Sequence, residues 1–137
     1  MIRRLAHVGI ATRSLKSLSR LYEDLGLEVE STETVADQKV RAAILPVGDT
    51  AVELLEGTEP DSVISRFVEK RGEGIHHIAF EVDDLREDLR RLRERNVVLI
   101  DEVPRTGAEG RLIAFIHPRS TGGVLVELTQ APVQPKE

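Results

Sequence analysis

The stretch His76-His77-Ile78-Ala79-Phe80 lies 70 positions after Ala6-His7-Val8-Gly9-Ile10, which it resembles in sequence. A second pair of segments, Val52-Glu53-Leu54 and Val126-Glu127-Leu128, recurs at a spacing of 74 positions. All four segments alternate in the way that half-buried β-strands do, with an apolar residue at every second position. The chain is therefore predicted to repeat one structural plan twice.

The two repeats are expected to span about residues 1–71 and 72–131, within a single domain, and a loosely ordered tail is expected at 132–137. Each repeat is predicted to contain a strand, a helix and then three strands. Ser14 and Asp84 are the expected N-caps of the two helices, because their side-chain oxygens can accept hydrogen bonds from the first helical turn. The expected strands are residues 4–11, 27–32, 39–46, 50–56, 75–82, 97–101, 111–117 and 123–129.

Two residues mark where these helices should end. Gly26 and Asn96 are placed to adopt the left-handed backbone conformation that commonly follows a helix. A third, shorter helix is expected after Pro60-Asp61-Ser62 and should close at Arg71-Gly72. This third helix would join the two repeats.

The composition excludes several classes of function. The 137 residues are 40% hydrophobic and 31% charged, which is enough to build a core and solvate a surface. The formal net charge of −5 and the small aromatic content argue against a nucleic-acid partner. No cysteine is present, so thiolate metal sites and a cysteine nucleophile are excluded. No apolar run reaches the roughly 18 residues of a membrane span and no signal peptide is recognisable, so we expect a cytoplasmic protein with no membrane partner.

Two histidines and two glutamates share a position in the repeated pattern. His7 and His77 alternate with small or polar neighbours on one face of their strands, whereas the residues between them are apolar. Glu53 and Glu127 each lie between two apolar residues and should likewise point away from the face that the helices cover. Any one of the four could be an ordinary structural residue. Together they form a set of two imidazoles and two carboxylates, which suits a divalent transition metal such as Co²⁺, Mn²⁺, Ni²⁺ or Zn²⁺.

Other candidate residues give weaker signals. His76 lies on the apolar face of its strand and His117 lies where a strand meets a loop, so both are interpreted as structural. The segment Ser120-Thr121-Gly122-Gly123 matches no nucleotide-binding fingerprint. As a functional loop, Ser120, Thr121 and Gly122 could offer backbone N–H groups to a carboxylate or thioester oxygen of a substrate.

Three motifs resemble the vicinal oxygen chelate superfamily and, within it, the methylmalonyl-CoA epimerases. They are His7-Val8-Gly9-Ile10-Ala11, the segment from Gly72 to Asp84, and the run from Ala114 to Leu128. The resemblance implies an α+β fold in which two tandem βαβββ modules form one curved eight-stranded mixed sheet with the helices outside. It also matches His7, His77 and Glu127 to metal ligands, Glu53 to a fourth ligand position and Gln38 to a possible substrate contact.

The resemblance implies an epimerase that interconverts (2R)- and (2S)-methylmalonyl-CoA by abstracting the proton α to the thioester, through an enolate that the metal stabilises. Glu127 and Glu53 are the candidate bases on the two faces of the substrate carbon. The position at which some family members carry a further glutamate base is Ala42 here. A lactoylglutathione lyase and a metal-free binding protein of the same superfamily are the alternatives. We expect an acyl-CoA substrate and a homodimer.

Overall fold

The computed structural model describes residues 1–107 and 110–132, so the predicted tail lies outside the described residues from residue 133 on. The strands are β1 (Ile2–Ala11), β2 (Ser31–Val35), β3 (Val40–Val47), β4 (Thr50–Gly57), β5 (Gly74–Val82), β6 (Arg105–Thr106), β7 (Leu112–Ile116) and β8 (Val126–Gln130). The helices are α1 (Leu15–Asp24), α2 (Val63–Arg71), α3 (Leu85–Glu94) and the short 3₁₀ helix η2 (Pro118–Ser120).

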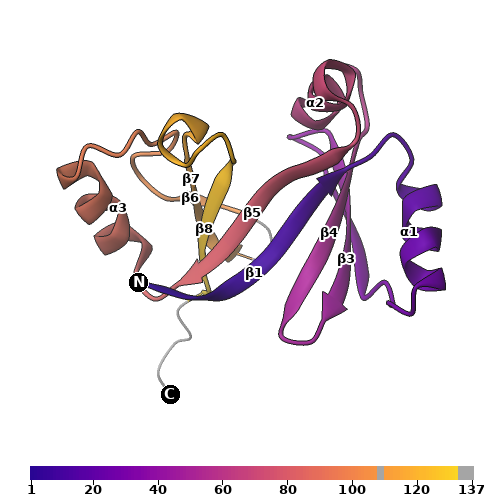
Figure 1. Ribbon diagram of the computed structural model, residues 1–137, viewed down its shortest axis with the longest axis horizontal. Helices are drawn as coiled ribbons and strands as arrows, with labels where there is room; N and C mark the ends of the chain where they lie inside the picture. The colour runs from indigo at the N-terminus through magenta and orange to yellow at the C-terminus, as the bar shows by residue number, and fades with distance from the viewer. Residues whose placement is uncertain (108–109, 133–137) are drawn as a thin grey trace. The chain divides into compact units, whose positions relative to one another are not determined.

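The eight strands of the described residues belong to one sheet, in the order β2-β3-β4-β1-β5-β8-β7-β6 (Figure 1). The pairs β1–β4 and β5–β8 are parallel, whereas β2–β3, β3–β4, β6–β7 and β7–β8 are antiparallel. Each half of the chain follows the order strand, helix, three strands, with α2 between the halves. The predicted α+β fold, with two βαβββ modules and a mixed eight-stranded sheet, is confirmed.

The chain divides into two compact units, residues 7–76 and residues 1–6 together with the described residues from 77 on. In the first unit, α1 begins at the predicted cap, because the Ser14 side chain accepts a hydrogen bond from the Ser17 backbone N–H at 3.1 Å. The helix ends before Gly26, whose φ of 103° lies in the left-handed region. Its apolar side packs on one face of β3 and β4, in the cluster Leu15, Ala43, Leu45 and Leu54.

Helix α2 packs on the opposite face of the same strands. Its buried residues Ile64 and Val68 join the cluster Ala11, Val40, Ala42 and Leu55. The approach is close at Gly57, where an added Cβ atom would lie 1.9 Å from Oγ of Ser65. Helix α1 therefore lies outside the sheet face to which Glu53 was predicted to point, as expected. Helix α2 instead covers one end of that face, because Ala11, Ala42 and Leu55 present an apolar surface there.

In the second unit, α3 begins at the predicted cap. The Asp84 carboxylate accepts a hydrogen bond from the Glu87 backbone N–H at 3.2 Å, and Asn96 adopts a left-handed φ of 61° after the last turn. The helix packs on one face of β5, β7 and β8. The buried members of this cluster are Val82, Leu85, Leu89, Ala114, Ile116 and Leu128.

Three strand predictions differ from the structure. β2 begins at Ser31, four residues later than expected, and β8 begins at Val126 rather than at residue 123. Residues 97–101 form only an isolated bridge, Leu99 to Ile116, and the edge strand is instead β6. The reason lies at Asp101, whose carboxylate accepts the hydrogen bond from the Phe115 N–H at 2.8 Å and so takes the place of a strand carbonyl.

Among the helices of the described residues, none is long and apolar enough to cross a membrane.

Candidate functional site

In each unit, the predicted ligand residues lie on the sheet face opposite that unit's own helix, α1 or α3. On β4, Leu54 packs under α1, so Glu53, the adjacent residue in the strand, points to the other side. On β8, Val126 and Leu128 pack under α3, so Glu127 points away from that helix. The predicted strand phase is confirmed for both glutamates.

In the unit of residues 7–76, His7 and Glu53 form a pair. Nε2 of His7 lies 3.7 Å from Oε2 of Glu53, and the two side chains are 17% and 19% exposed. Gly9 is the Cα partner of Glu53 in the parallel β1–β4 ladder, so no side chain stands beside Glu53 at that point of β1. Burial, and secondly the negative charge of Glu33, raise the pKa of Glu53 to about 7. Near neutral pH this carboxyl group is therefore poised between its protonated and ionised forms.

In the other unit, His77 and Glu127 form the corresponding pair. Nε2 of His77 lies 3.9 Å from Oε1 of Glu127, and both side chains are more deeply buried than those of the first pair, at 5% and 11% exposure. The ring of Phe115 meets the His77 imidazole edge-on, with a centroid distance of 6.2 Å. Arg105 lies over the Phe115 ring at 5.2 Å and pairs with Asp101 at 3.5 Å. Phe115 therefore links the His77 imidazole to the charged pair Arg105 and Asp101.

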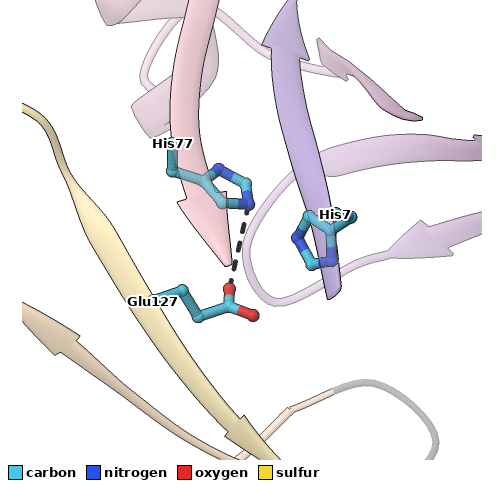
Figure 2. Close-up of side chains that lie close together, drawn as sticks. All are labelled: His7, His77 and Glu127. Carbon is cyan, nitrogen blue, oxygen red and sulfur yellow. Dashed lines mark ion pairs between the residues drawn. The ribbon is translucent and has the colours of Figure 1, made fainter. Parts of the chain in front are cut away.

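Figure 2 shows the side chains of His7, His77 and Glu127, with the ion pair between His77 and Glu127 dashed. These three residues form a group that could hold a metal ion. Imidazole nitrogens and carboxylate oxygens are both common ligands of divalent transition metals, so the donor set fits such an ion. The fourth predicted ligand, Glu53, is outside this group but lies against His7.

The other two histidines have structural contacts, in agreement with their interpretation from the sequence. His76 packs edge-on against Phe67 of α2 at 5.0 Å, and burial together with the charge of Arg71 lowers the pKa of the imidazole. Nδ1 of His117 accepts a hydrogen bond from the backbone N–H of Arg119 at 3.0 Å and so caps η2.

The residues predicted to contact substrate have local hydrogen bonds in the structure. Gln38 is exposed in the turn between β2 and β3, where its backbone N–H donates to the Val35 carbonyl. The Ser120 hydroxyl accepts a hydrogen bond from the Val98 N–H at 2.9 Å, and the Thr121 hydroxyl donates to the Val124 carbonyl. Gly122 has a left-handed φ of 71° in this turn. A substrate-binding role for these four residues stays a prediction.

Two residues near the pairs were not identified from the sequence. Phe115 lies on the predicted strand 111–117, but the sequence does not distinguish an aromatic residue that lines a site from one that packs in the core. Glu33 lies on β2 and acts electrostatically on Glu53. It lies outside the expected strand 27–32, so the sequence pattern assigns it to no face.

Comparison with known proteins identifies relatives along nearly the whole chain. The sequence pattern of the glyoxalase/bleomycin resistance protein/dioxygenase superfamily matches residues 6–115. The mitochondrial methylmalonyl-CoA epimerase of Dictyostelium discoideum is 37% identical over 94% of this chain and 79% of its own length. The ethylmalonyl-CoA/methylmalonyl-CoA epimerase of Cereibacter sphaeroides is 38% identical over 95% of this chain and 99% of its own.

A solved structure extends the similarity to three dimensions. A variant of Streptomyces coelicolor methylmalonyl-CoA epimerase, in complex with 2-nitronate-propionyl-CoA, superposes with a TM-score of 0.89 and 35% sequence identity. The similarity covers 100% of both chains.

Proposed function

The chain belongs to the glyoxalase/bleomycin resistance protein/dioxygenase superfamily, and we propose that it is a methylmalonyl-CoA epimerase like its relatives, which interconverts the (2R) and (2S) forms of its substrate. The observation that carries the proposal is the pair of matched His–Glu contacts, His7 with Glu53 and His77 with Glu127. A fold alone does not decide activity, whereas a site of this composition restricts the chemistry.

We place one divalent ion, Co²⁺, Mn²⁺, Ni²⁺ or Zn²⁺, among His7, Glu53, His77 and Glu127. The separations of 3.7 and 3.9 Å within the two pairs exceed the usual hydrogen-bond range. Two ligand atoms bound to one ion at about 2.0–2.2 Å are about 3–3.5 Å apart, so a small closure of each pair would suffice. When bound, such an ion would act as a Lewis acid that lowers the cost of negative charge on the thioester oxygen.

The chain's own residues would then move the proton. A glutamate carboxylate removes the proton from the carbon between the thioester and the carboxylate of the substrate, and the C–H electron pair delocalises into an enolate. A proton is returned to the opposite face, which inverts the configuration. Glu127 is the proposed base on one face. Glu53 is the counterpart that the sequence predicts on the other face. Both glutamates are also proposed ligands, so each would have to loosen from the ion when it takes the proton.

The proposed function is tested by incubating the metal-loaded protein with (2S)-methylmalonyl-CoA and following the fraction of the (2R) form. We expect conversion to an equal mixture. The matched control is the hemithioacetal of glutathione and methylglyoxal, which should give no lactoylglutathione. Formation of lactoylglutathione without epimerisation would replace the proposal with a lactoylglutathione lyase, and inactivity on both substrates would favour the metal-free binding protein.

We also propose a homodimer, since β2 and β6 are the two edge strands of the sheet and edges need cover. Light scattering coupled to size exclusion should give the mass of two chains rather than 15.2 kDa. The cytoplasmic location stays a prediction from the sequence.

A further inference from the structure

The reaction proposed above needs two proton-transferring groups, and both candidates, Glu127 and Glu53, are also proposed metal ligands. A carboxylate oxygen cannot bind the ion and accept a proton at the same time. A carboxylate that is not a ligand, on the same face as Glu53 in the same unit, would remove this conflict for one of the two proton transfers. Within the described residues of the unit 7–76, Glu33 on β2 has that position.

The strand register fixes the face to which Glu33 points. Glu33 is the Cα partner of Ala42 on β3, and Ala42 is the partner of Leu55 on β4. Partners directly opposite one another in a sheet point to the same side, so Glu33 shares the face of Leu55. Glu53, two residues before Leu55, has the same face. Exposure agrees, because Glu33 is half-buried whereas its strand neighbours Thr32 and Thr34 are exposed.

The residues around Glu33 and Glu53 on this face include several small ones. Ser31, Ile44 and Gly9 form the row across the sheet that contains Glu53, and two of these three are small. Ala42 extends only a methyl group beside Glu33. Helix α2 covers the sheet at the row of Ala42 and Leu55 with Ile64 and Val68. An apolar surface therefore lies on the side of Glu33 that is away from Glu53.

Glu33 and Glu53 are diagonal neighbours on this face. The row of Glu33 is two residues, about 7 Å, from the row of Glu53 along the strands, and β2 lies two strands, about 10 Å, from β4 across the sheet. Both side chains rise from the same side of the sheet, on either side of Ala42 and Ile44 of β3. Glu33 therefore faces the same region of the sheet as Glu53.

We infer that Glu33 is the second catalytic base, which exchanges a proton with the substrate carbon on the face opposite to Glu127, while Glu53 stays a metal ligand. The inference rests on the proposed function. In one direction the Glu33 carboxylate takes the proton from the carbon and the C–H electron pair enters the enolate. Protonated Glu127 then gives a proton to the opposite face. In the reverse direction Glu33 gives its proton. Because Glu33 is half-buried rather than enclosed, exchange with water can reset it between turnovers.

The test compares Glu33→Gln with the matched control Glu30→Gln, an exposed glutamate three residues earlier in the same unit. In D₂O, each epimer of methylmalonyl-CoA is supplied separately, and both inversion and deuterium uptake at the substrate carbon are measured. For Glu33→Gln we expect epimerisation to fall by about 100-fold or more, as for loss of a general acid–base. One epimer should still take up deuterium without inversion, because Glu127 still removes its proton. Metal content should equal that of the parent, and Glu33→Asp should recover part of the rate.

Epimerisation by Glu33→Gln at the parent rate would overturn the inference and leave the proposed function intact. Equal loss of deuterium uptake from both epimers at unchanged metal content would also overturn it, because a single base acts on only one face. A parent protein that epimerises neither form would instead refute the proposed function itself.

Discussion

Nε2 of His7 lies 3.7 Å from Oε2 of Glu53, and the repeat of the chain creates the same relationship between His77 and Glu127. Each pair joins the first strand of a module to its last strand, β1 to β4 and β5 to β8, and these strands run parallel. In each pair the histidine comes from the first strand and the glutamate from the last. One donor pair per module is therefore a consequence of the fold.

The first prediction is that purified protein binds about one divalent ion per chain. A His7→Ala/His77→Ala double variant should lose most of that metal, because it removes both imidazole donors. His117→Ala is the matched control, since the His117 side chain caps η2 and is not a predicted ligand, and it should keep the parent metal content. Elemental analysis after dialysis gives the ratio of metal to protein. A double variant with the parent ratio would contradict the ligand assignment.

The second prediction concerns pH and the stability of the metal-free protein. Burial raises the pKa of Glu53 in the folded state from its ordinary value of 4.5 to about 7. The folded state thus favours the protonated form, and the resulting stability is complete below pH 4.5 and is lost as pH rises through 7. In the presence of a chelator, the free energy of unfolding of the parent should therefore fall by up to about 3 kcal/mol between pH 4.5 and 8, relative to that of Glu53→Gln.

Urea unfolding at several pH values measures this difference. Glu30→Gln, which removes an exposed carboxylate from the same unit, should follow the parent at every pH. If the parent and Glu53→Gln had parallel stability profiles, the environment of Glu53 would not be the one described.

The third prediction tests the N-cap of α3. Asp84→Ala should destabilise the protein by about 1 kcal/mol, because the Glu87 N–H loses its acceptor. Asp83→Ala is the matched control: its carboxylate forms only an exposed ion pair with Arg3 in the structure, and such pairs contribute little. Chemical denaturation of both variants gives the comparison, and equal losses would show that the cap is not the source of the stability.

The fourth prediction concerns the contact between α2 and the sheet. Gly57→Ala should cost about 1–3 kcal/mol, because its Cβ atom would lie 1.9 Å from Oγ of Ser65. Adding Ser65→Ala removes that oxygen and should recover part of the loss. A Gly57→Ala variant as stable as the parent would mean that α2 lies further from β4 than described.

The sequence was sufficient to predict the parts of the fold that depend on local chemistry. Alternation in β1, β4, β5 and β8 gave the correct face for the two His–Glu pairs. The caps Ser14 and Asp84, and the helix ends at Gly26 and Asn96, were also predicted correctly, because each depends on side-chain and backbone preferences within one turn.

Predictions failed where tertiary contacts override an alternating pattern. Leu27 and Val29 alternate like strand residues, but they pack against the α1 cluster before the ladder of β2 begins at Ser31. At residues 97–101, the Asp101 side chain replaces a backbone acceptor, which no periodicity reveals. The face to which Glu33 points follows from its register with Ala42 on β3, which the sequence pattern does not reveal.

Solvent deuterium uptake by the parent protein tests the central claim most directly. Metal-loaded protein is incubated with (2S)-methylmalonyl-CoA in D₂O, and the recovered substrate is analysed for configuration and for deuterium at the carbon between the thioester and the carboxylate. We predict that the (2R) form appears with one deuterium at that carbon. Recovery of unlabelled (2S) substrate from folded, metal-loaded protein would contradict the proposal that this site removes the α-proton.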